Sequence, residues 1–147
     1  MKEIGIGVIG TAFMGKAHSI AYASAGTAFG GNLRPRLEMV CDQDPQIAEA
    51  KRAEMGFARC TTNYMDVVND PKVDLISICV PNSVHKEIAI AALAAGKHVW
   101  CEKPMSTNLA DSQAMVDAAE ASEQKTIVGY NYIQNPLVHA AREMINE

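Results

Sequence analysis

The chain has 147 residues, of which 48% are hydrophobic and 20% are charged, and its formal net charge is -4. This length fits one domain that buries roughly two thirds of its unfolded surface, and the composition excludes a disordered chain. The acidic balance argues against nucleic-acid binding, and without a signal-peptide layout or an apolar stretch of about 20 residues we expect no membrane association and a cytoplasmic protein.

Short apolar runs alternate with helical segments, a pattern typical of repeated βαβ units and a parallel sheet. The runs predict strands at Glu3–Ile9, Leu37–Asp42, Ala58–Thr61, Asp74–Val80, His98–Cys101 and Thr126–Tyr130. The fourth run is nearly all apolar, which is expected of a central strand covered by helices on both faces. Right-handed crossovers then predict a doubly wound α/β sheet, the Rossmann fold, with strand order 3-2-1-4-5-6 and a ligand cleft between the first and fourth strands.

Two helices are predicted from small and apolar residues at helical spacing. In the first, Ala17, Ile20, Ala21 and Ser24 should pack on the sheet, with Gly26 as the stop. In the second, Ile88 begins a similar row that ends at Gly96. Further helices are expected at Pro45–Met55, Asn63–Asn69, Thr107–Ser122 and Pro136–Asn146, and the stretch from Gly26 to Arg36 is expected to be a surface loop.

A glycine motif follows the first predicted strand and opens the first helix. It reads Gly10, Thr11, Ala12, Phe13, Met14, Gly15, a G-x-A-x-x-G variant of the dinucleotide fingerprint. The first glycine permits a tight turn, the middle position lets the backbone approach a pyrophosphate, and the last permits close helix packing. Ala12 narrows the approach by one methyl group but leaves the helix N-terminus open to phosphate. The candidate cofactor contacts in the motif are Gly10, Ala12, Phe13, Met14 and Gly15. The alternative is a tight turn that binds no ligand.

An acidic residue at the end of the second strand binds the ribose hydroxyls in folds of this type. Asp42 occupies that position, 27 residues after Gly15, whereas Asp44 is expected to start the following helix beside Pro45. A carboxylate repels a 2′-phosphate, so we expect NAD as the cofactor rather than NADP. Lys51 or Arg52 could offset that repulsion if either side chain reached back to the ribose.

Two loops at the carboxyl edge, together with the glycine motif, carry a family resemblance. The segments GVIGTAFMGKAH, VPNSVH, GKHVWCEKP and VGYNY resemble the N-terminal domain of the glucose-fructose oxidoreductase, inositol dehydrogenase and rhizopine-catabolism family (Gfo/Idh/MocA) over essentially the whole chain. The resemblance implies an NAD(P)-dependent enzyme that oxidises a sugar or cyclitol hydroxyl or reduces the ketone. It also implies a second α/β domain, here absent, that supplies substrate groups and the subunit interface.

The resemblance implies that Lys103 of the Glu-Lys-Pro segment is the catalytic residue, and that Glu102, Pro81, Asn82 and His85 line the nicotinamide end. Asn131 is a further candidate for the cofactor cleft. The plainer alternatives are a solvated loop lysine at position 103 and a surface histidine at position 85. His18 and His98 are interpreted as packing or surface residues.

Residues 1–147 are therefore interpreted as one NAD(P)-binding domain of a sugar or cyclitol dehydrogenase that is inactive alone and forms a homo-oligomer when full-length. A non-catalytic, dinucleotide-binding regulator of the same fold is the main alternative, and the intact Glu-Lys-Pro segment favours the enzyme. A self-contained short-chain dehydrogenase is disfavoured because no Tyr-x-x-x-Lys pair occurs. The four cysteines lack C-x-x-C spacing, so no metal site is expected.

Overall fold

The computed structural model describes residues 2–146, and within them the strands form one parallel sheet. The strands are β1 (Lys2–Ile9), β2 (Leu33–Cys41), β3 (Arg59–Thr61), β4 (Leu75–Ile78), β5 (His98–Cys101) and β6 (Thr126–Val128). Their order is β3-β2-β1-β4-β5-β6, with every neighbouring pair parallel. The predicted doubly wound topology is confirmed, and β4 lies in the interior of the sheet as expected from its apolar sequence.

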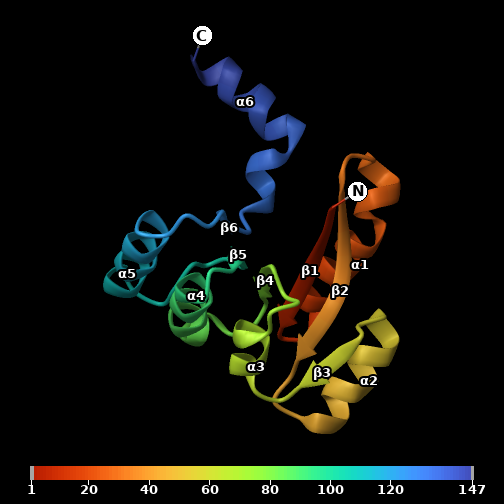
Figure 1. Cartoon of the computed structure of the whole chain (residues 1–147). Coiled ribbons are helices and arrows are strands. Elements are labelled where there is room, and N and C mark those ends of the chain that lie inside the picture. The colour runs from red at the N-terminus through yellow and green to blue at the C-terminus, as the bar shows by residue number, and fades with distance from the viewer. Residues whose placement is uncertain (1, 147) are drawn as a thin grey trace.

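Helices connect the strands and cover the sheet (Figure 1). They are α1 (Phe13–Phe29), α2 (Pro45–Met55), α3 (Tyr64–Asn69), α4 (His85–Ala94), α5 (Leu109–Glu120) and α6 (Pro136–Asn146), with short 3-10 helices η1 (Asn82–Val84) and η2 (Asn131–Gln134). Contacts join α1 to α2, and join α3 to α4 and α4 to α5. Figure 1 shows α6 extending away from the sheet, and α6 has no buried residue. Among residues 2–146, no helix is long and apolar enough to span a bilayer.

The core is divided by the sheet into two apolar clusters. Ile6, Val8 and Val40 belong to one cluster, which also contains Phe57. Ile9, Ile76 and Ile78 belong to the other, larger cluster, which α3, α4 and α5 cover. Successive strand residues point to opposite faces, so β1 contributes to both clusters. This two-sided burial accounts for the continuous apolar character of the central strands.

The prediction of a surface loop between Gly26 and Arg36 is wrong, because helix α1 and strand β2 both extend into this segment. Helix α1 continues past Gly26 to Phe29 and ends where Gly30 and Gly31 adopt positive φ values of 63° and 95°. Strand β2 begins at Leu33 and includes Pro35. Proline is tolerated there because β3 pairs only with Met39–Cys41, which leaves that edge of β2 without a partner strand at Pro35.

The face of α1 that packs on the sheet also differs from the prediction. Ile20 is 59% exposed and Ala21 and Ser24 are exposed, whereas Gly15, His18 and Ser19 are buried. Apolar spacing missed this face because its two polar side chains are satisfied internally. Ser19 donates to the Gly15 carbonyl at 2.7 Å, and both ring nitrogens of His18 have partners.

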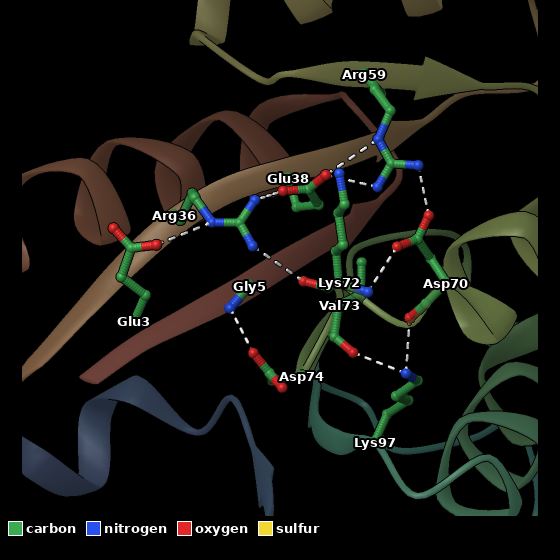
Figure 2. A network of polar contacts seen from close by, with 10 residues as sticks. All are labelled: Glu3, Gly5, Arg36, Glu38, Arg59, Asp70, Lys72, Val73, Asp74 and Lys97. Atoms are coloured by element: carbon green, nitrogen blue, oxygen red, sulfur yellow. Dashed lines mark hydrogen bonds and ion pairs between the residues drawn. The ribbon is translucent and has the colours of Figure 1, made fainter.

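A network of charges closes the amino end of the sheet, opposite the predicted cleft (Figure 2). The register between β1 and β2 shifts after Ile6, which leaves Glu38 unpaired between its neighbours and 2% exposed. Its Oε1 accepts from Arg59 at 2.6 and 3.0 Å, and its Oε2 faces the Arg36 guanidinium as an ion pair. Arg59 also binds Asp70 at 2.5 Å, which lowers the pKa of that carboxyl.

We expect Arg59→Met to lower the free energy of unfolding by about 2 kcal/mol. Losing one partner of a fully buried pair costs about 3–5 kcal/mol, but Arg36 remains beside Glu38 and Arg59 itself is partly exposed. Because the Asp70 pKa is lowered in the folded state, its share of this stability is present above the ordinary carboxyl pKa and is lost as the pH falls. Urea unfolding at neutral and acidic pH measures both effects; equal loss at both would contradict the Asp70 contribution.

Candidate cofactor site

A cleft of about 620 Å³ opens at the carboxyl edge of the sheet. Its walls come from the segments that follow β1, β2, β3 and β4, and from the first turn of α4. This is the edge where ligands of open α/β sheets bind, at the point where the strand order reverses. Of the predicted site residues, Gly10, Ala12, Asp42 and Pro81 line this cleft.

The turn between β1 and α1 can exist only with glycine at its two ends. Gly10 has a φ of 96°, and a Cβ there would overlap the carbonyl oxygen of Cys79. A Cβ at Gly15 would overlap the carbonyl oxygen of Gly10. The two glycines therefore bring β1, β4 and the first turn of α1 into direct backbone contact, which exposes Ala12 at the mouth of the turn.

The N-terminus of α1 lacks the side-chain cap that α2, α3 and α5 each have. Asp44, Asn63 and Asn108 cap α2, α3 and α5 through their side chains, as predicted for Asp44. Helix α1 begins after Ala12 with no side-chain cap and no acidic residue in its first turn. Its N–H groups and positive dipole end are thus open to an anion, so the residues present fit the diphosphate of a dinucleotide.

Asp42 lies directly after β2 and contributes its half-buried carboxylate to the cleft. Its Oδ2 accepts from the Thr11 hydroxyl, and its Oδ1 accepts from the Asp44 amide at 3.3 Å. Thr11 belongs to the glycine turn, so this contact fixes the carboxylate relative to the helix that would hold the diphosphate. The arrangement suits the binding of two ribose hydroxyls beside the diphosphate.

The two cations that could have reached Asp42 bind elsewhere. Lys51 pairs with Glu54 at 2.6 Å, and Arg52 pairs with Glu49 at 2.6 Å on the same helix. Neither Lys51 nor Arg52 lines the cleft.

The histidine at position 85 is buried rather than a surface group, with 1% of its area exposed. Its Nε2 lies 2.8 Å from the Val80 carbonyl oxygen and its Nδ1 lies 3.1 Å from that of Pro104. His85 therefore joins the segment after β4 to the segment after β5, and its ring lies outside the lining of the cleft. Asn82, in η1 on the same loop, is half-buried.

The Glu-Lys-Pro segment directs its two charged side chains differently. Lys103, two residues after β5, is exposed, whereas Glu102 is 6% exposed and binds His18 at 3.0 Å. Neither residue lines the cleft, and the same holds for Phe13, Met14, Gly15 and Asn131. The exposed position leaves the Lys103 amine accessible to a bound molecule, and Asn131 is also exposed, in η2.

Sequence reasoning missed part of the cleft wall. Thr11, Gln43 and the segment Thr62–Tyr64 after β3 line the cleft, as do Ser83 and Glu87. The position of Thr62–Tyr64 could have been inferred, because this segment follows a strand that ends at the same edge of the sheet. Nothing in the local sequence marks Glu87, which enters through the first turn of α4.

All four cysteines are free thiols. Burial raises the pKa of Cys41, Cys79 and Cys101 to about 12, so these thiols stay protonated at neutral pH although Cys41 and Cys79 line the cleft. Within residues 2–146, no three His, Cys, Asp or Glu side chains gather as they would around a metal ion.

Comparison with known proteins shows which family this sequence matches. Residues 4–130 match the Gfo/Idh/MocA model, described as an oxidoreductase family with an NAD-binding Rossmann fold. Levoglucosan dehydrogenase of Pseudarthrobacter phenanthrenivorans is 36% identical over 148 aligned residues, which cover all of this chain and 38% of that protein. Myo-inositol 2-dehydrogenase of Thermotoga maritima is 29% identical, over 86% of this chain and 36% of that protein.

A solved structure of levoglucosan dehydrogenase in complex with NADH and levoglucosan superimposes with a TM-score of 0.92 at 36% identity. That match covers 99% of this chain and 40% of the solved chain. The chain thus spans less than half the length of the relatives that it matches.

Proposed function

The chain belongs to the Gfo/Idh/MocA oxidoreductase family and is an NAD-binding Rossmann domain, and we propose that it serves a sugar or cyclitol dehydrogenase as its cofactor half. The observation that carries the proposal is the uncapped N-terminus of α1, set by Gly10 and Gly15 against the cleft that Asp42 lines. Relatives named for levoglucosan and myo-inositol support the substrate class.

The residues of the chain would divide the work between the two ends of the cofactor. The first turn of α1 would hold the diphosphate, and Asp42 would accept hydrogen bonds from the adenosine ribose. Pro81, Asn82 and Lys103 would lie toward the nicotinamide, on loops that His85 ties together. Bound NAD supplies the hydride acceptor, and Lys103, in its neutral amine form, would accept the proton that leaves the substrate hydroxyl.

Groups outside these residues would complete the enzyme, because the chain spans about two fifths of its relatives. We propose that a second domain holds the substrate and supplies the subunit interface. A cytoplasmic location and a homo-oligomeric state stay predictions.

Calorimetric titration of the 147-residue chain tests the proposal directly. We expect NADH to bind, and a panel of sugars and cyclitols to give no turnover with NAD, because we place the groups that hold the substrate in the proposed second domain. Failure of NADH to bind would refute the proposed function. Turnover above a cofactor-only background would show instead that these residues form a complete enzyme.

We expect the chain to bind NAD more tightly than NADP by about tenfold or more. A carboxylate and a phosphate about 4 Å apart repel by ~4 kcal/mol at an effective dielectric of about 20, and even a third of this value corresponds to about tenfold in affinity. The pairing of Lys51 with Glu54 and of Arg52 with Glu49 leaves this repulsion without a compensating cation from α2.

Titration of both cofactors against Asp42→Ser measures this selectivity, and the ratio of affinities should fall toward one. Asp44→Ser is the matched control, since serine also caps a helix and Asp44 lies outside the cleft. The prediction is contradicted if the parent binds both cofactors equally or if the two serine variants behave alike.

A further inference from the structure

A buried polar chain runs through the interior from α1 to the segment that carries Lys103. The Tyr22 hydroxyl lies 2.7 Å from Ser77 Oγ, which in turn lies 3.1 Å from His18 Nδ1. His18 Nε2 lies 3.0 Å from Glu102 Oε1. These contacts therefore link helix α1, the central strand β4 and the residue directly after β5. The residues that they join are 59 and 84 positions apart in the sequence.

This series of buried polar contacts has one consistent arrangement of hydrogen-bond donors when His18 is neutral. Burial raises the pKa of Tyr22 to about 12, so its hydroxyl keeps its proton and donates to Ser77. Ser77 then donates to Nδ1, and the Nε2–H of His18 donates to the Glu102 carboxylate. Every proton is used, and each is donated toward Glu102.

The residues around Glu102 restrict the position of its carboxylate. His18 and Glu102 are 7% and 6% exposed, and the Trp100 ring stands edge-on to the imidazole with ring centroids 5.0 Å apart. On the other side, a Cβ at Gly129 would overlap the carboxylate, so the glycine after β6 provides its space. The cost of desolvating the Glu102 carboxylate largely offsets the gain from its hydrogen bond to His18, so the main effect of the contact is to fix position rather than to add stability.

His18 lies near the proposed diphosphate site, and Glu102 lies next to Lys103. His18 lies one helical turn after Gly15, on the helix whose N-terminus would hold the diphosphate. Glu102 is bonded through its amide to Ile78 and precedes Lys103, whose side chain is exposed. The pair is thus the direct side-chain contact between the diphosphate helix and the lysine segment.

We infer that His18 and Glu102 are positioning residues, which fix the segment of Lys103 to the diphosphate helix so that binding at one end orders the other. The inference rests on the proposed function, because it takes α1 as the diphosphate site. Neither residue touches the cofactor in this inference; both act through the backbone that they hold.

ADP is the probe that tests this coupling in the 147-residue chain. It carries the adenosine and the diphosphate but no nicotinamide, so it has no group that could reach Lys103 directly. Saturating ADP should slow amide hydrogen exchange in residues 102–106 of the parent by about fivefold or more, the lower range of coupling between sites. It should also change the emission of Trp100, the one tryptophan in the sequence, which contacts His18.

His18→Asn and Glu102→Ala should still bind ADP within a few fold but lose both responses. Glu102→Gln keeps an oxygen that can accept from Nε2–H, so it should restore part of the exchange protection. Lys86→Met is the matched control, because it breaks a 2.5 Å pair with Asp111 between α4 and α5, away from this chain of contacts. It should keep both responses.

Amide hydrogen exchange in the central strands β1 and β4 shows whether each variant is folded. If His18→Asn is not folded, Glu102→Ala alone provides the test. ADP binding that leaves residues 102–106 unprotected in the parent would overturn the inference alone. Retained protection in both His18→Asn and Glu102→Ala would overturn it as well. If the parent binds neither ADP nor NADH, the proposed function fails and the inference falls with it.

Discussion

Replacing Gly15 with valine should reduce NADH binding by the 147-residue chain more than a hundredfold, which amounts to about 3 kcal/mol or more. A Cβ at this position would overlap the carbonyl oxygen of Gly10, which is backbone and cannot rotate away. The first turn of α1 must then separate from β1, and the N–H groups that would hold the diphosphate move with it. The loss should appear as a weaker Kd in a fluorescence titration.

Ala12→Gly provides the opposite test at the same turn. Ala12 is exposed at the mouth of the turn, so removing its methyl group should leave binding unchanged or make it tighter. Circular dichroism distinguishes a local defect from unfolding in Gly15→Val, whose far-UV spectrum should stay close to that of the parent. Tight NADH binding by a folded Gly15→Val protein would show that the diphosphate does not lie on this turn.

The features that sequence predicted well are those set by local rules. Alternating apolar runs, right-handed crossovers and the turn at Gly10 fix the order of the strands without any knowledge of side-chain contacts. The position of Asp42 in the cleft follows in the same way, because the residue after each parallel strand reaches the same edge of the sheet. The capping role of Asp44 needs only its own short-range geometry.

Features that depend on polar contacts between distant segments could not be predicted. The local sequence indicates only a packing or surface role for His18, because its two partners, Ser77 and Glu102, lie far away in the sequence. Glu38 has no local signal either, since its burial depends on a register shift between β1 and β2 and on Arg59 of β3. Apolar periodicity cannot predict a helix face whose buried side chains are polar and hydrogen-bonded.

The cleft and the Lys103 side chain lie in different parts of the structure. The walls of the cleft come mainly from the segments after β1, β2, β3 and β4, whereas Lys103 is presented after β5 and outside the cleft lining. Removal of the Lys103 amine should therefore leave the cofactor contacts in place. This separation makes substitution of Lys103 a test of chemistry rather than of binding.

Lys103→Met should lower kcat by about 10²- to 10⁴-fold, the range for loss of an acid-base group, while the Kd for NADH stays within a few fold. The hydroxyl proton must leave as hydride leaves the carbon, and methionine of similar length has no group to accept it. Turnover can be measured in a chimera that replaces the aligned N-terminal part of levoglucosan dehydrogenase with residues 1–147, once the parent chimera oxidises levoglucosan. Lys125→Met, at another exposed lysine, is the control and should keep full activity. Equal kcat values for the Lys103 and Lys125 variants would make Lys103 a solvated loop residue and assign proton transfer to the other domain.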